Sequence, residues 1–211
     1  MNDSIVLRPL RRTDYSAVAE MIRRMWYAEP ELSLPCARRL AMIDLHYSLS
    51  GSSSAMVAQC GSRVVGIIAT HVDAHEARSR RRPFGWHRQA ILALAVPLLF
   101  SAEGRGGLRK MLSLTSIDER LLRGVQHRFG AEVALFLVDE SIRGHGVGRM
   151  LFDHAMDDFR KAGVNRYFLF TDTRCDIGFY DHRGLSRLRG RKAALYGDAP
   201  DTFCLYEGRP E

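Results

Sequence analysis

The stretch Val133-Ala134-Leu135-Phe136-Leu137-Val138 and the glycine-rich stretch that follows it, Arg143-Gly144-His145-Gly146-Val147-Gly148, decide the fold. The first is an apolar run that predicts a buried strand. After the second, apolar residues recur at helical spacing at Met150, Leu151, Ala155 and Phe159. Strand, glycine turn and helix in this order predict an anion site, because the free amides at a helix N-terminus point toward a bound phosphate. Glycines let the backbone approach that anion without Cβ atoms in the way.

The spacing of the glycines excludes two common nucleotide sites. A dinucleotide-binding fingerprint needs G-x-G-x-x-G and an acidic residue after the next strand, whereas this loop has G-x-G-x-G. A P-loop needs Lys and Ser or Thr after its last glycine, and here Gly148 is followed by Arg149 and Met150.

The pattern Arg-x-x-Gly-x-Gly after a strand ending Val138-Asp139-Glu140 resembles the acyl-CoA-binding motif of the GCN5-related N-acetyltransferases (GNAT). The resemblance implies that the loop amides bind the pyrophosphate of acetyl-CoA. It also implies that the preceding strand splays from its neighbour and pairs with the pantetheine arm, and Phe136 lies in that segment. The cofactor-binding residues that match are Leu137, Val138, Arg143, Gly144, His145, Gly146, Val147, Gly148 and Arg149. The family tolerates many residues at the histidine, which we expect to face solvent.

A second stretch, from Asp176 through Phe179-Tyr180 to Gly184-Leu185, resembles the family's short helix with a Phe-Tyr pair. The resemblance implies that Tyr180 lies near the thioester sulfur and protonates the departing thiolate. A phenol of pKa ~10 is a reasonable donor to a thiolate whose conjugate acid titrates near ~8.5. The alternative is a tyrosine that only anchors the helix. The family often has Asn before this pair, where the chain has Asp172-Thr173-Arg174-Cys175-Asp176, with Asp176 as a candidate helix cap.

Acetyl transfer to an amine also requires removal of a proton, because an ammonium has no lone pair. Glu132, at the start of the strand before the loop, matches a position where many family members carry a catalytic Glu. The alternative is a surface carboxylate, with water taking the proton. We expect Asp139 and Glu140 to shape the turn, and Glu103 to reach the acceptor if its segment forms a lid. A covalent route through Cys175 with His182 is disfavoured, because the direct route already accounts for the motif.

The order of predicted elements matches the fold that the resemblance implies. That fold is α/β (α+β), a mixed, mostly antiparallel sheet of about seven strands flanked by helices. The resemblance covers roughly residues 1–73 and 131–207, and we expect a single domain over 1–211. The predicted strands are 5–9, 55–60, 64–71, 132–138, 167–171, 185–195 and 202–207, and the predicted helices are 13–27, 33–49, 149–162 and 176–183.

Residues 74–130 form an insertion between the third and fourth strands, where the family usually has a short turn. The insertion holds eleven Lys and Arg against four Asp and Glu, an excess of seven that equals the chain's net charge of +7. The insertion is predicted to be helical. One predicted helix covers 88–100, and a capping box at Ser116-Ile117-Asp118-Glu119 predicts another running to about Arg128.

The insertion has several candidate roles. It could be a lid over the acceptor, a homodimer surface, or a contact through Arg80-Arg81-Arg82 with an acidic partner, either a nucleic acid backbone or an anionic membrane surface. The sparse aromatic residues disfavour a nucleic-acid partner. It could also pack on the main domain while its arginines keep it soluble. The apolar residues that suggest a dimer are Leu92, Leu94, Leu98, Leu99 and Phe100.

Composition sets the remaining limits on this chain of 211 residues. The start of the sequence leads directly into a strand, so we expect no signal peptide. The longest apolar stretch, 90–100, is too short to span a bilayer. The four cysteines have neither C-x-x-C spacing nor histidines at zinc spacing, so the simplest expectation is a reduced, cytoplasmic, metal-free protein.

These observations predict an acetyl-CoA-dependent N-acetyltransferase that transfers an acetyl group to a primary amine by direct attack in a ternary complex. The alternatives are a non-catalytic acyl-CoA-binding regulatory or interaction module, and an acetyltransferase recruited to nucleic acid by the arginine run. The sequence does not distinguish a small amine, an amino acid, an antibiotic or a protein lysine as the acceptor.

Overall fold

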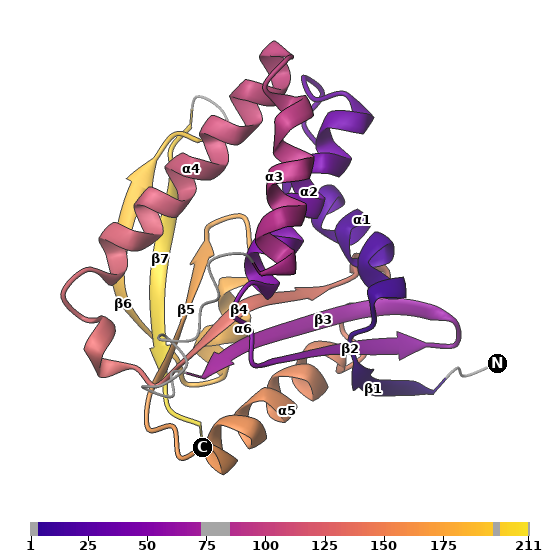
Figure 1. Cartoon of the computed structure of the whole chain (residues 1–211). Coiled ribbons are helices and arrows are strands. Elements are labelled where there is room, and N and C mark those ends of the chain that lie inside the picture. The colour runs from indigo at the N-terminus through magenta and orange to yellow at the C-terminus, as the bar shows by residue number, and fades with distance from the viewer. Residues whose placement is uncertain (1–3, 73–84, 196–198, 211) are drawn as a thin grey trace.

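The computed structural model describes residues 4–72, 85–195 and 199–210 (Figure 1). Its centre is a seven-stranded sheet with the order β1-β2-β3-β4-β5-β7-β6, in which only β4 and β5 are parallel neighbours. The strands are β1 (Ile5–Pro9), β2 (Ser54–Cys60), β3 (Arg63–Val72), β4 (Ala131–Val138), β5 (Tyr167–Asp172), β6 (Ser186–Ala193) and β7 (Asp201–Gly208). The helices are α1 (Tyr15–Trp26), α2 (Leu34–Leu49), α3 (Trp86–Leu98), α4 (Ala102–Leu122), α5 (Val147–Lys161) and α6 (Ile177–His182). The predicted fold class is confirmed.

Helices cover both faces of the sheet (Figure 1). On one face α5 buries Leu151, Phe152 and Phe159 against the strands. On the other face α1 and α2 cover β2, β3 and β4, while α4 packs over β5 and β7 through Ile117 and Leu121. The α5 face of the sheet therefore carries one continuous core, whereas the opposite face is covered by two separate groups of helices.

A β-bulge divides β4 in the middle. Val133 lies opposite Thr70 of β3 and Leu135 lies opposite Ala69, so Ala134 is the extra residue. Such a residue bends the strand and reverses the facing of the side chains after it. Val133 accordingly packs in the core of the α5 face, whereas Leu135 packs against α1 and α2.

The parallel pairing of β4 with β5 ends at this bulge. The last pair in register is Val133 with Leu169, while β4 runs on to Val138 paired with β3 alone. At Phe136, Leu137 and Val138, the edge of β4 that faces β5 is therefore no longer paired with β5. The splay predicted from the resemblance is therefore present, and its onset coincides with the bulge at Ala134.

The second helix predicted for the insertion has the wrong start. Its helix, α4, begins after Ser101, whose hydroxyl accepts from the amide of Gly104 at 3.0 Å, and it ends at Leu122. The predicted capping residue Ser116 therefore lies inside the helix. A capping box starts a helix because it binds backbone amides that have no helical partner. Here the helix already runs from Ala102, so the amides near Ser116 bond to carbonyls of the preceding turn and need no cap.

Glycines near the start of α4 lower the helix propensity of this segment, so the sequence does not predict a helix there. Packing explains why they are present. A Cβ built on Gly104 would lie 2.3 Å from the carbonyl oxygen of Leu98, and one on Gly107 would lie 2.4 Å from Leu40 Cδ1. These two positions let α4 approach the end of α3 and the middle of α2. The low helix propensity of glycine is offset by close packing.

The apolar surface predicted on the insertion is only partly present. Leu98 is 3% exposed, and Leu94 packs with it against α2. Leu92, Leu99 and Phe100 are 64%, 52% and 83% exposed. The predicted set therefore divides into residues that fix α3 to α2 and residues that face outward. The arginine run at 80–82 lies outside the described residues.

Candidate active site

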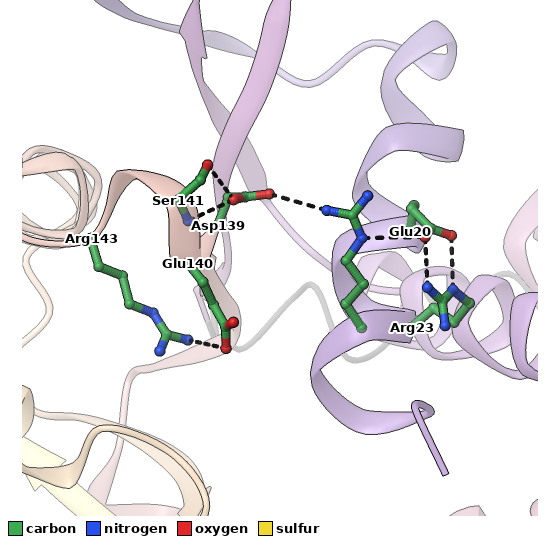
Figure 2. Close-up of polar contacts among 7 residues, drawn as sticks. Glu20, Arg23, Asp139, Glu140, Ser141 and Arg143 are labelled. Atoms are coloured by element: carbon green, nitrogen blue, oxygen red, sulfur yellow. Dashed lines mark hydrogen bonds and ion pairs between the residues drawn. The ribbon is translucent and has the colours of Figure 1, made fainter. Parts of the chain in front are cut away.

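The turn after β4 is held by a carboxylate, as the sequence predicts. The amide of Asp139 donates to Val65 O at 2.9 Å, which keeps the turn in register with β3. Its side chain accepts from the amide of Ser141 at 2.9 Å and from the Ser141 hydroxyl at 2.6 Å (Figure 2). These hydrogen bonds, more than the nearby arginines, hold the pKa of Asp139 below its usual value.

Ion pairs connect this turn to α1 (Figure 2). Arg24 lies 3.9 Å from the Asp139 carboxylate and 3.3 Å from Glu20, which also pairs with Arg23 at 2.8 Å. The predicted cofactor residue Arg143 lies 3.5 Å from Glu140 within the turn. The Arg143 guanidinium therefore supports the turn in this structure and stays half-exposed at the surface.

The glycine loop leaves a set of backbone amides open. Gly144 and Gly146 have φ of +80° and +79°, a conformation that L side chains rarely adopt. Within the described residues, no backbone or side-chain oxygen accepts from the amides of Gly144, Gly146, Val147, Gly148 and Arg149. The open amides of Val147, Gly148 and Arg149 belong to the first turn of α5, which starts two residues earlier than predicted. Free amides at a helix start can bind an anion, so this turn is the candidate anion site.

Gly148 has a different role from the other two glycines. A Cβ there would lie 3.4 Å from Phe136 Cζ, 3.6 Å from Val138 Cγ2 and 3.6 Å from Phe179 Cε2. These are ordinary van der Waals distances, so packing does not require glycine at the start of α5, which lies against the splayed end of β4 and the helix α6. His145 is exposed, and its ring nitrogen Nδ1 lies 3.0 Å from Arg143 O, in agreement with a solvent-facing position.

Tyr180 is placed at the splay by α6. The Asp176 side chain caps that helix by accepting from the Phe179 amide at 3.3 Å, as predicted. The Tyr180 ring lies 6.5 Å from Phe136 of β4 and is 8% exposed. Burial raises the pKa of the Tyr180 phenol, while the neighbouring Thr171 hydroxyl acts in the opposite direction. The phenol therefore keeps its proton at any physiological pH.

Arg183, which the sequence did not single out, fastens α6 to α5. Its guanidinium carbon lies 5.3 Å from the centre of the Phe152 ring and 5.7 Å from that of Phe179. It donates to Arg149 O at 3.3 Å and pairs with Asp153. The pairing joins residues 30 positions apart, and no local pattern in the sequence could indicate it.

The covalent alternative finds no support in the geometry. His182 Nδ1 lies 2.6 Å from Gly178 O within its own helix. Burial raises the pKa of the Cys175 thiol, which disfavours the thiolate needed for nucleophilic attack.

An acidic group occupies the opposite face of the sheet, beside the splay. It consists of Asp44 of α2, Asp118 of α4, Glu132 of β4 and Asp172 of β5. Burial raises the pKa of Asp118 to about 8, with a further contribution from the charges of Glu132, Asp172 and Asp44. Burial also raises the pKa of Asp44 to about 6, although the Tyr27 hydroxyl donates to its carboxylate at 3.2 Å.

Asp172 connects this acidic group to the tyrosine, because its charge raises the pKa of both Asp118 and Tyr180. The structure thus brings the predicted Glu132 together with three aspartates that the sequence did not single out as site residues. The sequence places Asp118 inside a capping box at the start of a helix, whereas in the structure Asp118 lies in the last turns of α4.

Glu103 does not reach this region, contrary to the expectation for a lid. Its carboxylate accepts from the amide and the hydroxyl of Ser33, both at 2.8 Å, and so ties the start of α4 to the start of α2. Its distance from the acidic group follows from its place in the first turn of α4, whereas Asp118 lies in the last turns of that helix.

Within the described residues, no group of three or more His, Cys, Asp and Glu side chains is arranged to hold a metal ion. The same part of the chain contains no helix with the length and apolar character that crossing a bilayer requires.

Open amides at a helix start, a splayed strand pair and a buried tyrosine between them lie together in this structure, in the arrangement that the resemblance to the acyl-CoA-dependent acetyltransferases predicts. Comparison with known proteins tests that resemblance. Residues 100–185, from the start of α4 to the end of α6, match the acetyltransferase (GNAT) family. The predicted resemblance is confirmed, and the match and fold together support an N-acetyltransferase of the GNAT type. No curated protein matches the sequence.

Solved structures share the fold at low sequence identity. The ribosomal-protein-S18-alanine N-acetyltransferase from Escherichia coli aligns with a TM-score of 0.58 at 14% identity, covering 99% of this chain and 95% of its own. The polyamine N-acetyltransferase of Drosophila melanogaster gives 0.57 at 10% identity, with coverages of 98% and 100%. The yncA protein from Salmonella typhimurium, solved with acetyl-CoA, gives 0.56 at 12% identity, with coverages of 98% and 94%.

Proposed function

We propose that this chain transfers the acetyl group of acetyl-CoA to a primary amine by direct attack in a ternary complex. The observation that carries the proposal is the set of open amides of Gly144 and of Gly146 to Arg149 beside the splay of β4 from β5. Two adjacent phosphates need several N–H donors on a surface free of Cβ atoms, and this loop supplies them.

The cofactor would extend from this loop along β4. With its pyrophosphate on these open amides, its pantetheine arm would run beside Phe136, Leu137 and Val138, on the side that β5 has left. Backbone groups of a strand that has lost its neighbour can pair with the amides of the arm. The thioester would then lie at the point where β4 and β5 separate, next to Tyr180.

Tyr180 would act as the general acid. The amine nitrogen forms a bond to the carbonyl carbon, the carbon–sulfur bond breaks, and the sulfur leaves with the electron pair. The phenol donates its proton to that sulfur, the acetylated nitrogen releases its extra proton to water, and water returns a proton to the phenolate. The buried, protonated state of Tyr180 supports this role.

Glu132 would act as the general base, either directly or through water. A primary amine is an ammonium at neutral pH and must lose a proton before attack. In the free protein Asp118 holds a proton near pH 7, because its pKa is raised to about 8, and the charge of Glu132 contributes to that shift. An ammonium arriving beside them would favour ionised carboxylates, so the acidic group suits a cationic amine.

Calorimetric titration with acetyl-CoA tests the proposal, with Gly146→Val as the blocked loop and Gly124→Val as its matched control. The φ angles of Gly146 and Gly124 are +79° and +81°, and at both a new Cβ would meet no atom within 4 Å. The two variants therefore carry the same backbone strain, but only Gly146 adjoins the open amides.

We expect micromolar binding by the natural chain and by Gly124→Val, and at least a 100-fold weaker affinity for Gly146→Val, since the side chain would stand where the pyrophosphate approaches. Equal affinity of both variants would show that the loop is only a turn. Tight binding without turnover on a panel of primary amines would favour the non-catalytic acyl-CoA-binding module.

A further inference from the structure

The outer side of α4 forms a second, strongly cationic feature. Two adjoining hollows of about 450 and 410 Å³ lie between α4 and the strand β6, and both are lined by Arg120 and Arg191. We call them together the α4–β6 groove; Figure 1 shows α4 running alongside β6 and β7. The cationic residues of its lining are Arg109, Arg120, Arg189, Arg191 and Lys192, and the lining contains no carboxylate.

These cations lack acidic partners. In the part of the chain that the structure describes, none of the five forms an ion pair. Arg189 is held in place, because it donates to Leu121 O at 2.9 Å and to Arg123 O at 2.7 Å at the end of α4. The other four side chains are exposed. Like charges gathered without partners cost stability in the free protein and attract an anionic partner.

We propose that the α4–β6 groove binds an acidic segment of a partner protein, which lies extended beside β6. In the described residues β6 pairs only with β7, so alternate N–H and C=O groups of its outer edge are available to another chain. Arg189 and Arg191 lie two positions apart on one face of the strand. They would meet every second side chain of an extended peptide, and a guanidinium pairs with a carboxylate through two parallel hydrogen bonds.

The remaining lining residues favour a peptide over a nucleic acid. They are small or aliphatic: Leu112, Ser113, Ser116, Ile117, Leu121, Gly190 and Ala193. An aliphatic floor can receive the apolar side chains that alternate with carboxylates in such a peptide. Single-stranded nucleic acids are usually held by aromatic side chains that stack on the bases, and this lining contains none.

The α4–β6 groove is separate from the acetyl-transfer site, so the proposal does not depend on the proposed activity. Asp118 and Arg120 lie on the same helix, yet the first joins the acidic group and the second lines the groove. The helix α4 thus stands between an acidic region and a basic one.

Fluorescence anisotropy with the full chain tests the proposal. The probe is a labelled ten-residue peptide of alternating Glu and Val; its partners are the same peptide with Gln for Glu, and a labelled thymidine oligonucleotide of equal charge. The variant is Arg120→Gln with Arg191→Gln, and the control is Arg38→Gln with Arg39→Gln, which makes the same charge change at exposed positions of α2.

We expect the Glu peptide to bind, the Gln peptide to bind at least tenfold more weakly, and the groove variant to lose at least tenfold in affinity while the control changes less than twofold. Circular dichroism confirms that both variants fold. Equal losses in the two variants would assign binding to net charge alone and overturn the proposal. Tighter binding of the oligonucleotide than of the Glu peptide would also overturn it.

Discussion

Two helices on opposite faces of the sheet, α5 and α4, use glycine in opposite ways. Gly146, at the start of α5, has a positive φ and open space around it, so the residue is required by backbone conformation. Gly104, in the first turn of α4, has ordinary helical geometry but no room for a Cβ. Glycine therefore marks the proposed anion site at one helix and a packing contact at the other, and only the first use follows a motif.

The largest effect on stability is expected at the packing contact of α4. Gly104→Ala would push a methyl group into the Leu98 carbonyl, which lies 2.3 Å from the built Cβ, and overpacking against backbone costs about 3 kcal/mol. Gly106→Ala is the matched control, because nothing lies within 4 Å of its Cβ. Helix propensity predicts a gain of about 0.5–1 kcal/mol there.

Urea unfolding of both variants measures this difference. A Gly104→Ala protein as stable as the natural chain would show that α4 is not packed on the end of α3. The comparison between the two helices would then lose its structural basis.

On the α5 side, Tyr180→Phe should lower kcat by about 30- to 100-fold, which is within the range of general acid catalysis, while the affinity for acetyl-CoA changes little. Tyr206→Phe is the control: its ring lies 5.9 Å from that of Tyr180, and its hydroxyl donates to Asp181 at 3.3 Å. Steady-state kinetics of the two variants separates the roles. Equal, small changes in both would reduce Tyr180 to an anchor of α6.

A smaller effect is expected from Asp118→Asn on the inner side of α4, and it depends on pH. The folded-state pKa of Asp118 is raised to about 8 from an ordinary value near 4, so the folded chain binds this proton more tightly than the unfolded chain. The natural protein therefore loses stability as pH rises from about 4 to about 8. The Asn variant lacks this loss and should be more stable by about 2 kcal/mol at pH 8.5 but similar at pH 4.

Thermal unfolding across this pH range, with Glu119→Gln as the exposed neighbouring control, measures the effect. A constant difference between Asp118→Asn and the natural chain at all pH values would show that Asp118 is not protonated near neutral pH. The acidic group would then be a solvated surface feature.

The α5 side could be predicted from the sequence because its determinants are local. Gly144, Gly146 and Tyr180 lie in short motifs whose backbone conformation depends on adjacent residues. The α4 side could not be predicted in this way. Asp118 acquires its surroundings from three other elements, and the capping pattern around Ser116 is overridden by a helix already formed at Ser101. The role of Arg183 could not be predicted either, because its partners Arg149, Phe152 and Asp153 lie on another helix, α5.

The bulge at Ala134 has a consequence for how β4 can vary in length. In this strand the odd-numbered residues face α5 before the bulge and face α1 and α2 after it. Removing Ala134 would place Leu135 directly after Val133, opposite neighbouring residues of β3, and plain alternation would leave every later side chain on the face it already occupies. Phe136 and Val138 would stay near Gly148, and Leu135 and Leu137 would stay in their core. The strand can therefore lose Ala134 and keep its parity, but it would lose the bend that the bulge introduces.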